Sequence, residues 1–209
     1  MRIAVIAAGG RSGRAFVMAA LKAGHHVRAG VHGAASFPPY DRLEVMPCDA
    51  TKAAEVRRLL DDQEAVVSLI GHTKGSAPDV QTAAIRHVVR AMSELGIERL
   101  VSLTGTGVRL AGDKPTIMDR LLNLAVSMVD PARVRDGREH AELLKASNLA
   151  WTVIRVLKLQ NVPSQPFMLT LHGPTKLYVG RDEVAVAILQ VLEQQSFVRA
   201  MPIISPTGR

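Results

Sequence analysis

A glycine-rich turn near the start of the chain carries the clearest chemical signal in the sequence. Residues 6–13 read IAAGGRSG and stand directly between a short apolar segment and an amphipathic one. Glycine at positions 10 and 13 lets the backbone turn tightly and approach a pyrophosphate, while the following helix offers free N–H groups and a positive dipole end. This context predicts a dinucleotide-binding turn. The predicted cofactor contacts are Ala8, Gly9, Gly10, Arg11, Ser12 and Gly13.

The residues that end the second expected strand bear on the choice of cofactor. NAD sites place Asp or Glu about 20 residues beyond the glycines, where it binds the ribose 2′-hydroxyl. Val31, His32 and Gly33 occupy that place here. An acid would repel the 2′-phosphate of NADP, so its absence favours NADP, with NAD still possible. Arg11 and His32 are the candidate 2′-phosphate contacts.

Asp49 and Ala50 follow the third expected strand and are predicted to lie near the adenine. The Asp49 carboxylate could accept a hydrogen bond from the adenine amino group. It could equally cap the helix expected to begin near residue 52, because Asp is a favoured N-cap residue. The sequence leaves both alternatives open.

Three further side chains follow the fourth, fifth and sixth expected strands, where ligands bind in sheets of this kind. His72 titrates in a range suited to proton donation, or is an idle loop histidine. Thr104 could bind the nicotinamide ribose or a substrate oxygen, or cap the following turn. Lys158 could attract an anionic substrate, or point to solvent. These three are the candidate catalytic residues.

The elements that must position these side chains alternate between strand and helix. The short strands are almost continuously apolar, which is typical of a parallel sheet covered on both faces. The fold class is therefore α/β, a doubly wound parallel sheet of the Rossmann type, in a single domain over residues 1–209. Residues 157–209 are expected to contribute a small substrate lobe. Strands are expected at 3–7, 27–32, 43–46, 65–70, 99–103, 151–156 and 200–204, and helices at 12–23, 52–60, 79–95, 117–129, 135–147 and 183–193.

Composition narrows the classes of partner. The chain of 209 residues carries a net charge of +7, and its first forty residues hold five basic side chains and no acid. Aromatic residues make up only 3%, which argues against nucleic acid and favours a small phosphate-bearing ligand. The apolar runs are too short for a membrane span. The single cysteine, Cys48, and the lack of metal-ligand spacing point to a metal-free cytoplasmic protein.

These segments together resemble the atypical short-chain dehydrogenases/reductases, the branch that holds the NmrA-like and the biliverdin-reductase-B or flavin-reductase types. The resemblance covers nearly the whole chain. It implies that Ile70, Gly71 and Leu103, with Thr104, pass the nicotinamide half of the cofactor. The matching segments are AAGGRSG at 7–13, CDA at 48–50, LIGH at 69–72, VSLTG at 101–105, SNLAWTVIRV at 147–156 and VGRDEVA at 179–185.

One departure from the family pattern concerns the reaction. Conventional members use a Tyr-x-x-x-Lys pair, but Tyr40 and Tyr178 are the only tyrosines and neither precedes a lysine by four residues. The helix that should carry the pair reads RDGREH at 135–140. Hydride transfer to a flavin, quinone or similar planar acceptor demands little of the protein. We therefore expect an NAD(P)H-dependent reductase of planar small molecules, monomeric or homodimeric.

Two alternatives stay open from the sequence. A non-catalytic NADP sensor of the NmrA type is equally compatible with the missing pair. An isomerase or epimerase ranks last, because it needs an acid/base pair that the sequence does not reveal.

Overall fold

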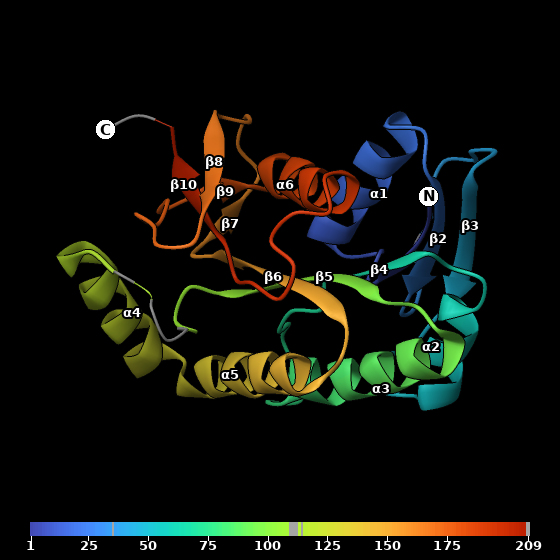
Figure 1. Cartoon of the computed structure of the whole chain (residues 1–209), viewed down its shortest axis with the longest axis horizontal. Coiled ribbons are helices and arrows are strands. Elements are labelled where there is room, and N and C mark those ends of the chain that lie inside the picture. Colours follow the sequence, from blue (N-terminus) through green and yellow to red (C-terminus); the bar gives the residue numbers. More distant parts are fainter. Residues whose placement is uncertain (35, 109–112, 114, 208–209) are drawn as a thin grey trace.

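The computed structural model describes residues 1–34, 36–108, 113 and 115–207 as a three-layer α/β structure (Figure 1). Within that part, no helix is long and apolar enough to cross a bilayer. The strands are β1 (Arg2–Ile6), β2 (His26–Val31), β3 (Leu43–Pro47), β4 (Ala65–Ser68), β5 (Arg99–Gly105), β6 (Ala150–Val156), β7 (Leu159–Gln160), β8 (Phe167–Thr170), β9 (Val179–Gly180) and β10 (Ile203–Pro206). The helices are α1 (Arg11–Lys22), α2 (Ala53–Leu60), α3 (Val80–Leu95), α4 (Ile117–Val129), α5 (Pro131–Ala146) and α6 (Arg181–Glu193).

The main sheet confirms the expected doubly wound fold class. Its strand order is β3-β2-β1-β4-β5-β6-β10-β8, and every neighbouring pair is parallel except β10 with β8. The order reverses between β1 and β4, so the turn after β1 and the loop after β4 face one crevice at the carboxyl ends of the strands.

Apolar residues on both faces of each central strand hold the layers together. In β1, Ile3 and Val5 belong to the core beneath α1 and α6, whereas Ala4 and Ile6 belong to the core above α2, α3 and α5. All four are almost fully buried. This explains why the strand shows no polar alternation. Figure 1 shows the two helix layers on opposite sides of the sheet.

The carboxyl-terminal residues do not form a separate body. Helix α6 packs along α1, and β10 joins the main sheet between β6 and β8. Strands β7 and β9 form a small parallel pair of their own. Helix α4 stands apart at one end of the molecule (Figure 1), where it contacts α5.

Candidate functional site

The glycine-rich turn leaves β1 through an unusual backbone conformation. Ala7 has φ of 61°, in the left-handed region, at the position where the family pattern has glycine. This conformation costs a residue with a Cβ about 1–2 kcal/mol. The turn is fixed by hydrogen bonds from Ala8 N to Gly30 O, 2.9 Å, and from Gly10 N to Ala7 O, 3.1 Å.

Gly13 allows α1 to start directly against this turn. A Cβ at position 13 would lie 2.3 Å from Ala7 O and 2.7 Å from Ala8 Cα, both of them rigid backbone atoms. Gly10 is the exposed N-cap of α1, so no N-cap side chain occupies the first N–H groups of the helix. The residues present therefore fit a pyrophosphate at the positive end of the helix dipole.

Basic side chains surround the turn. Arg11 is exposed. Burial lowers the pKa of the Arg181 guanidinium, and the nearby positive charge of Arg11 lowers it further. Arg181 begins α6, so two helix starts and two cations converge here. Its segment matches the family pattern, but the sequence did not link its charge to the turn, because only the packing of α6 on α1 brings them together.

Arg14 was also missed as a site residue. Its guanidinium donates to Gly9 O at 3.1 Å and to Ser36 O at 2.7 Å, and it lies 5.0 Å from the centre of the Phe37 ring. Arg14 therefore fastens the glycine turn to the segment after β2. The acid-free start of the sequence was the only signal for it.

Asp49 and His32 lie at neighbouring strand ends. Hydrogen bonds from Thr51 lower the pKa of the Asp49 carboxyl, and the charges of His32 and Lys52 lower it further. The proposed helix cap is wrong: α2 begins at Ala53, Lys52 is its N-cap, and Asp49 Oδ1 instead accepts from Thr51 N at 3.0 Å. Asp49 closes a local turn because three further residues separate it from the start of the helix.

The loop after β4 brings Ile70 and Gly71 to the crevice. Ile70 is half-buried, and its carbonyl oxygen accepts a hydrogen bond from Gln81 Nε2 at 2.7 Å. Gly71 is exposed, while Leu103 on β5 is buried. Ala8 is fully buried behind the turn, and Ala50 is half-buried beside Asp49. This arrangement leaves the exposed backbone of the turn and of Gly71 at the surface of the crevice.

His72 is not an exposed loop residue. Its Nε2 atom lies 2.9 Å from Asp136 Oδ2, and the two side chains are 11% and 1% exposed. His72 Nε2 makes no directed hydrogen bond, so the two side chains are in close polar contact only. Asp136 comes from α5, the helix that carries Tyr-x-x-x-Lys in conventional relatives.

Thr104 meets the same part of α5. A Cβ on Gly137 would lie 2.6 Å from Thr104 Oγ1, so the helix backbone passes directly over this side chain. Thr104 is 5% exposed. Two of the three candidate catalytic residues therefore lie beside consecutive residues of one helix turn.

His140, one turn further along α5, does not face the crevice. Its Nε2 atom lies 3.1 Å from Ser102 Oγ in the core. Burial lowers the pKa of the His140 imidazole to about 4, although the nearby Asp136 acts in the opposite direction. His140 is therefore neutral at physiological pH and serves packing rather than proton transfer.

Lys158 lies after β6 on an exposed stretch. Its ammonium group is 5.4 Å from the centre of the Tyr178 ring, a cation–π distance. Both side chains are exposed. Lys158 belongs to the loops around β7 and β9, where its carbonyl oxygen accepts from Val179 N at 2.9 Å.

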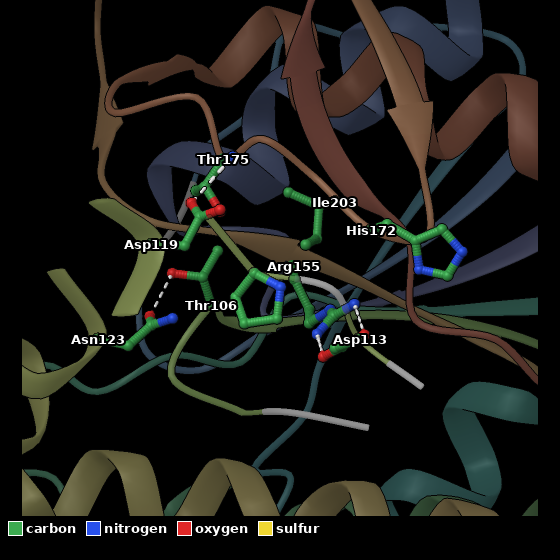
Figure 2. Close-up of a pocket in the computed structure, with 9 residues that line it drawn as sticks. Thr106, Asp113, Asp119, Asn123, Arg155, His172, Thr175 and Ile203 are labelled. Carbon is green, nitrogen blue, oxygen red and sulfur yellow. Dashed lines mark hydrogen bonds and ion pairs between the residues drawn. The ribbon is translucent and has the colours of Figure 1, made fainter. Parts of the chain in front are cut away.

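A polar pocket opens beyond β5 and β6, between α4 and the loop before β9 (Figure 2). The Arg155 guanidinium is buried there and forms a two-pronged ion pair with Asp113; it also donates to Met201 O at 2.8 Å. Asp119 opposite accepts from Thr175 N at 3.1 Å. The lining residues are Thr106, Asp113, Pro115, Asp119, Asn123, Arg155, His172, Thr175 and Ile203.

Sequence reasoning missed this pocket, because its lining residues come from four separate segments of the chain. Burial alone would raise the pKa of the Asp119 carboxyl, but hydrogen bonds from Thr116 and Thr175 outweigh it and lower the pKa. Asp119 and Arg155 therefore hold α4 and the surrounding loops in place. The only available signal was Arg155 within the family-like segment at 147–156.

Comparison with known proteins settles the family. A family model described as NAD(P)H-binding matches residues 7–195, which is most of the chain. The chain belongs to this NAD(P)H-binding family. The expected cofactor class and the resemblance to atypical short-chain dehydrogenases/reductases are confirmed.

Solved structures share the fold over their whole length. A wide-type short-chain dehydrogenase/reductase from Veillonella parvula in complex with NADP has 20% identity and a TM-score of 0.82, covering 99% of this chain and 95% of that one. A putative epimerase from Bacteroides thetaiotaomicron has 19% identity, a TM-score of 0.81 and coverages of 100% and 98%. An anaerobillin reductase from Escherichia coli O157:H7 has 16% identity, a TM-score of 0.77 and coverages of 100% and 98%.

Proposed function

We propose that the chain is an NADPH-dependent reductase that delivers hydride to a planar conjugated acceptor such as a flavin or a quinone. The observation that carries this proposal is the meeting of His72 and Thr104 at α5, across the crevice from a turn shaped for a dinucleotide. No Tyr-x-x-x-Lys pair is present in the sequence. Such a site favours an acceptor that needs orientation and one proton rather than an activated tyrosine.

The basic surroundings of the turn support NADPH over NADH. His32 takes the place of the acid typical of NAD sites, and Arg11 and Arg181 add positive charge near the turn. The NADP complex of the Veillonella relative agrees with this choice. Arg11 and His32 are the proposed 2′-phosphate contacts.

The chain's own residues would divide the work as follows. A bound nicotinamide supplies the hydride. The glycine turn and Gly71 fix the cofactor, Thr104 orients the acceptor by a hydrogen bond, and His72 donates the proton. Lys158 attracts an anionic substituent of the acceptor. An anaerobillin reductase of E. coli shares this fold, so the fold is compatible with a reduction.

The deciding experiment is anaerobic oxidation of NADPH and of NADH with FMN, riboflavin and a quinone as acceptors. Loss of the reduced-nicotinamide absorbance, faster with NADPH and dependent on one acceptor, is the expected result. A parallel titration measures binding of each dinucleotide. Failure of both dinucleotides to bind would overturn the proposed role of Gly10 and Gly13.

A sensor of the NmrA type is the second candidate. The missing Tyr-x-x-x-Lys pair supports it as well as the reductase. A sensor would bind NADP or NADPH tightly, prefer one redox state and show no acceptor-dependent oxidation. The same two measurements therefore separate the candidates.

A further inference from the structure

Asp136 joins three parts of the molecule that meet at the crevice. Its Oδ1 accepts a hydrogen bond from Thr82 N at 2.8 Å, and its Oδ2 accepts one from Gln81 N at 2.9 Å. Its backbone oxygen accepts from Thr82 Oγ1 at 3.1 Å. The carboxylate of one helix therefore caps the start of another, and the loop after β4 closes over both.

This environment explains how a side chain that is 1% exposed can remain charged. Burying a carboxylate without partners is very unfavourable. Here the two N–H groups belong to the first turn of α3, where the helix dipole stabilises a negative charge. Helix α3 makes no cap with its own N-cap residue, Asp79, so Asp136 fills that role from α5.

Asp136 could cap α3 without His72, so the capping role does not explain why a histidine lies beside the carboxylate. His72 Nε2 lies 2.9 Å from the same Oδ2 atom that accepts from Gln81. Gln81 Nε2 also holds the His72 loop through Ile70 O. The fixed carboxylate and the fixed loop therefore leave the imidazole partly exposed at one defined place.

We propose that Asp136 is a positioning residue that holds His72 for proton donation to the acceptor. This inference rests on the proposed function and deepens it. In this proposal the His72–Asp136 pair takes the place of Tyr-x-x-x-Lys. Asp136 lies on α5, the helix that carries Tyr-x-x-x-Lys in conventional relatives, and the proton donor His72 lies in the loop after β4. The acceptor class is thereby narrowed to conjugated molecules that gain a proton on a nitrogen or oxygen as they are reduced.

The reaction balances with groups already named. The acceptor gains two electrons with the hydride from NADPH and one proton from the His72 imidazolium. NADP⁺ and neutral His72 remain, and His72 takes its next proton from solvent, to which its side chain is 11% exposed. Asp136 keeps its two backbone hydrogen bonds throughout and takes no part in the proton transfer.

Four variants test the proposal: Asp136→Asn, His72→Gln, the double variant, and Thr82→Ala as the matched control. Thr82→Ala removes the hydroxyl bond between α3 and α5 but keeps the carboxylate and its backbone donors. Asp136→Asn keeps the size of the side chain and removes its charge. Rates, NADPH affinity and thermal unfolding are measured for each.

The expected rates distinguish a positioning role of Asp136 from a purely structural role. His72→Gln and Asp136→Asn each lower kcat about 100-fold, in the range of a lost general acid. The double variant is no slower than either single one, because the two groups act as a unit. NADPH affinity stays within about threefold, as expected when only the transition state loses an interaction. Thr82→Ala keeps kcat while lowering the unfolding temperature.

An NMR measurement of the His72 ring gives a readout that needs no turnover. In ¹⁵N-histidine-labelled chain, the ring nitrogens of His72, assigned by their loss in His72→Gln, should indicate an ordered ring in the wild type and in Thr82→Ala, and an averaged ring in Asp136→Asn. Unchanged His72 signals in Asp136→Asn would overturn the positioning role, as would an Asp136→Asn variant that keeps the wild-type kcat. If the His72 ring is ordered in the wild type but the chain oxidises no NADPH, the His72–Asp136 contact is supported and the proposed reductase function is overturned.

Discussion

Helices α1 and α4 lie in different parts of the molecule and differ in what covers them (Figure 1). Helix α1 is enclosed between the sheet and α6 and buries Phe16, Val17, Ala20 and Leu21. Helix α4 buries only Asp119 and leaves large apolar side chains in solvent. The exposed set on α4 is Ile117, Met118, Leu121, Leu124, Met128 and Val129.

The difference shows that different interactions stabilise the region of α1, here called the cofactor end, and the region of α4, here called the α4 end. The cofactor end depends on apolar burial and on a backbone contact that tolerates no side chain. The α4 end depends on polar contacts, a capping box between Thr116 and Asp119 and the bond from Thr175. Substitutions at the two ends should therefore differ in size and in pH dependence.

The largest effect is expected for Phe16→Ala. The side chain is fully buried beneath α6, so its removal leaves a cavity in the core. The free energy of unfolding should fall by about 3–5 kcal/mol. Urea denaturation measures it, with Met18→Ala on the exposed side of the same helix as the control. A loss below about 1 kcal/mol would show that α1 is not enclosed as described.

Gly13→Ala should damage both stability and cofactor binding. The added Cβ would meet Ala7 O at 2.3 Å, so the turn or α1 must move. Such overpacking costs about 1–3 kcal/mol. NADPH binding, followed by titration, should weaken at least tenfold. Gly105→Ala is the control, because a Cβ there meets no atom within 4 Å. Equal NADPH binding by both variants would contradict the proposed turn.

Asp119→Asn should loosen α4 and change its response to acid. In Asp119→Asn, the amide NH₂ group would face the backbone N–H of either Thr116 or Thr175, which is also a donor. The free energy of unfolding should therefore fall by about 1–2 kcal/mol. The pKa of Asp119 is lowered from 3.8 in the folded chain. Its stabilising contribution is therefore complete above that value and is lost as the pH falls through the folded-state pKa.

Urea denaturation of the wild type and of Asp119→Asn at several pH values tests whether the contribution of Asp119 to stability is lost in acid. The difference between them should be constant near neutrality and shrink below about pH 4. A difference that grows in acid would mean that the Asp119 carboxyl is held in its neutral form.

The smallest effect is expected for Leu121→Ala on α4. The side chain is 58% exposed, so its truncation should change the free energy of unfolding by less than about 0.5 kcal/mol. Sedimentation at two protein concentrations accompanies the denaturation. A loss above about 1 kcal/mol that grows with protein concentration would show that α4 is covered in solution.

The sequence predicted the strand, turn and helix around residues 6–13 because they follow one another directly in the chain. The turn at 6–13 is followed at once by the helix it serves, and the continuous apolar runs identify the buried strands. Helix α5 begins at Pro131, earlier than expected, because the Asp130 cap and the proline at N1 were overlooked. The interpretation of Asp49 as a helix cap failed for the opposite reason, since a nearer partner, Thr51, was available.

The surroundings of His72 and the polar pocket beside α4 could not be predicted in the same way. Asp136 is a charged residue among the arginines of a polar helix, which is typical of a solvent face. Only the packing of α5 against α3 buries it and brings it to His72. Arg155 is similar, because its partner Asp113 lies far away in the chain. Asp119 has a local partner in Thr116, but no local pattern indicates its bond from Thr175.

The position of β10 in the sheet has a consequence for biosynthesis. Strand β8 is made more than thirty residues before β10, yet it joins the sheet only through β10. The half of the sheet that carries the glycine turn can pair fully as soon as β5 has emerged, because β1 to β5 are neighbours. A nascent chain can thus form the dinucleotide turn while the acceptor end is still open, and translation through Pro206 completes the enclosure.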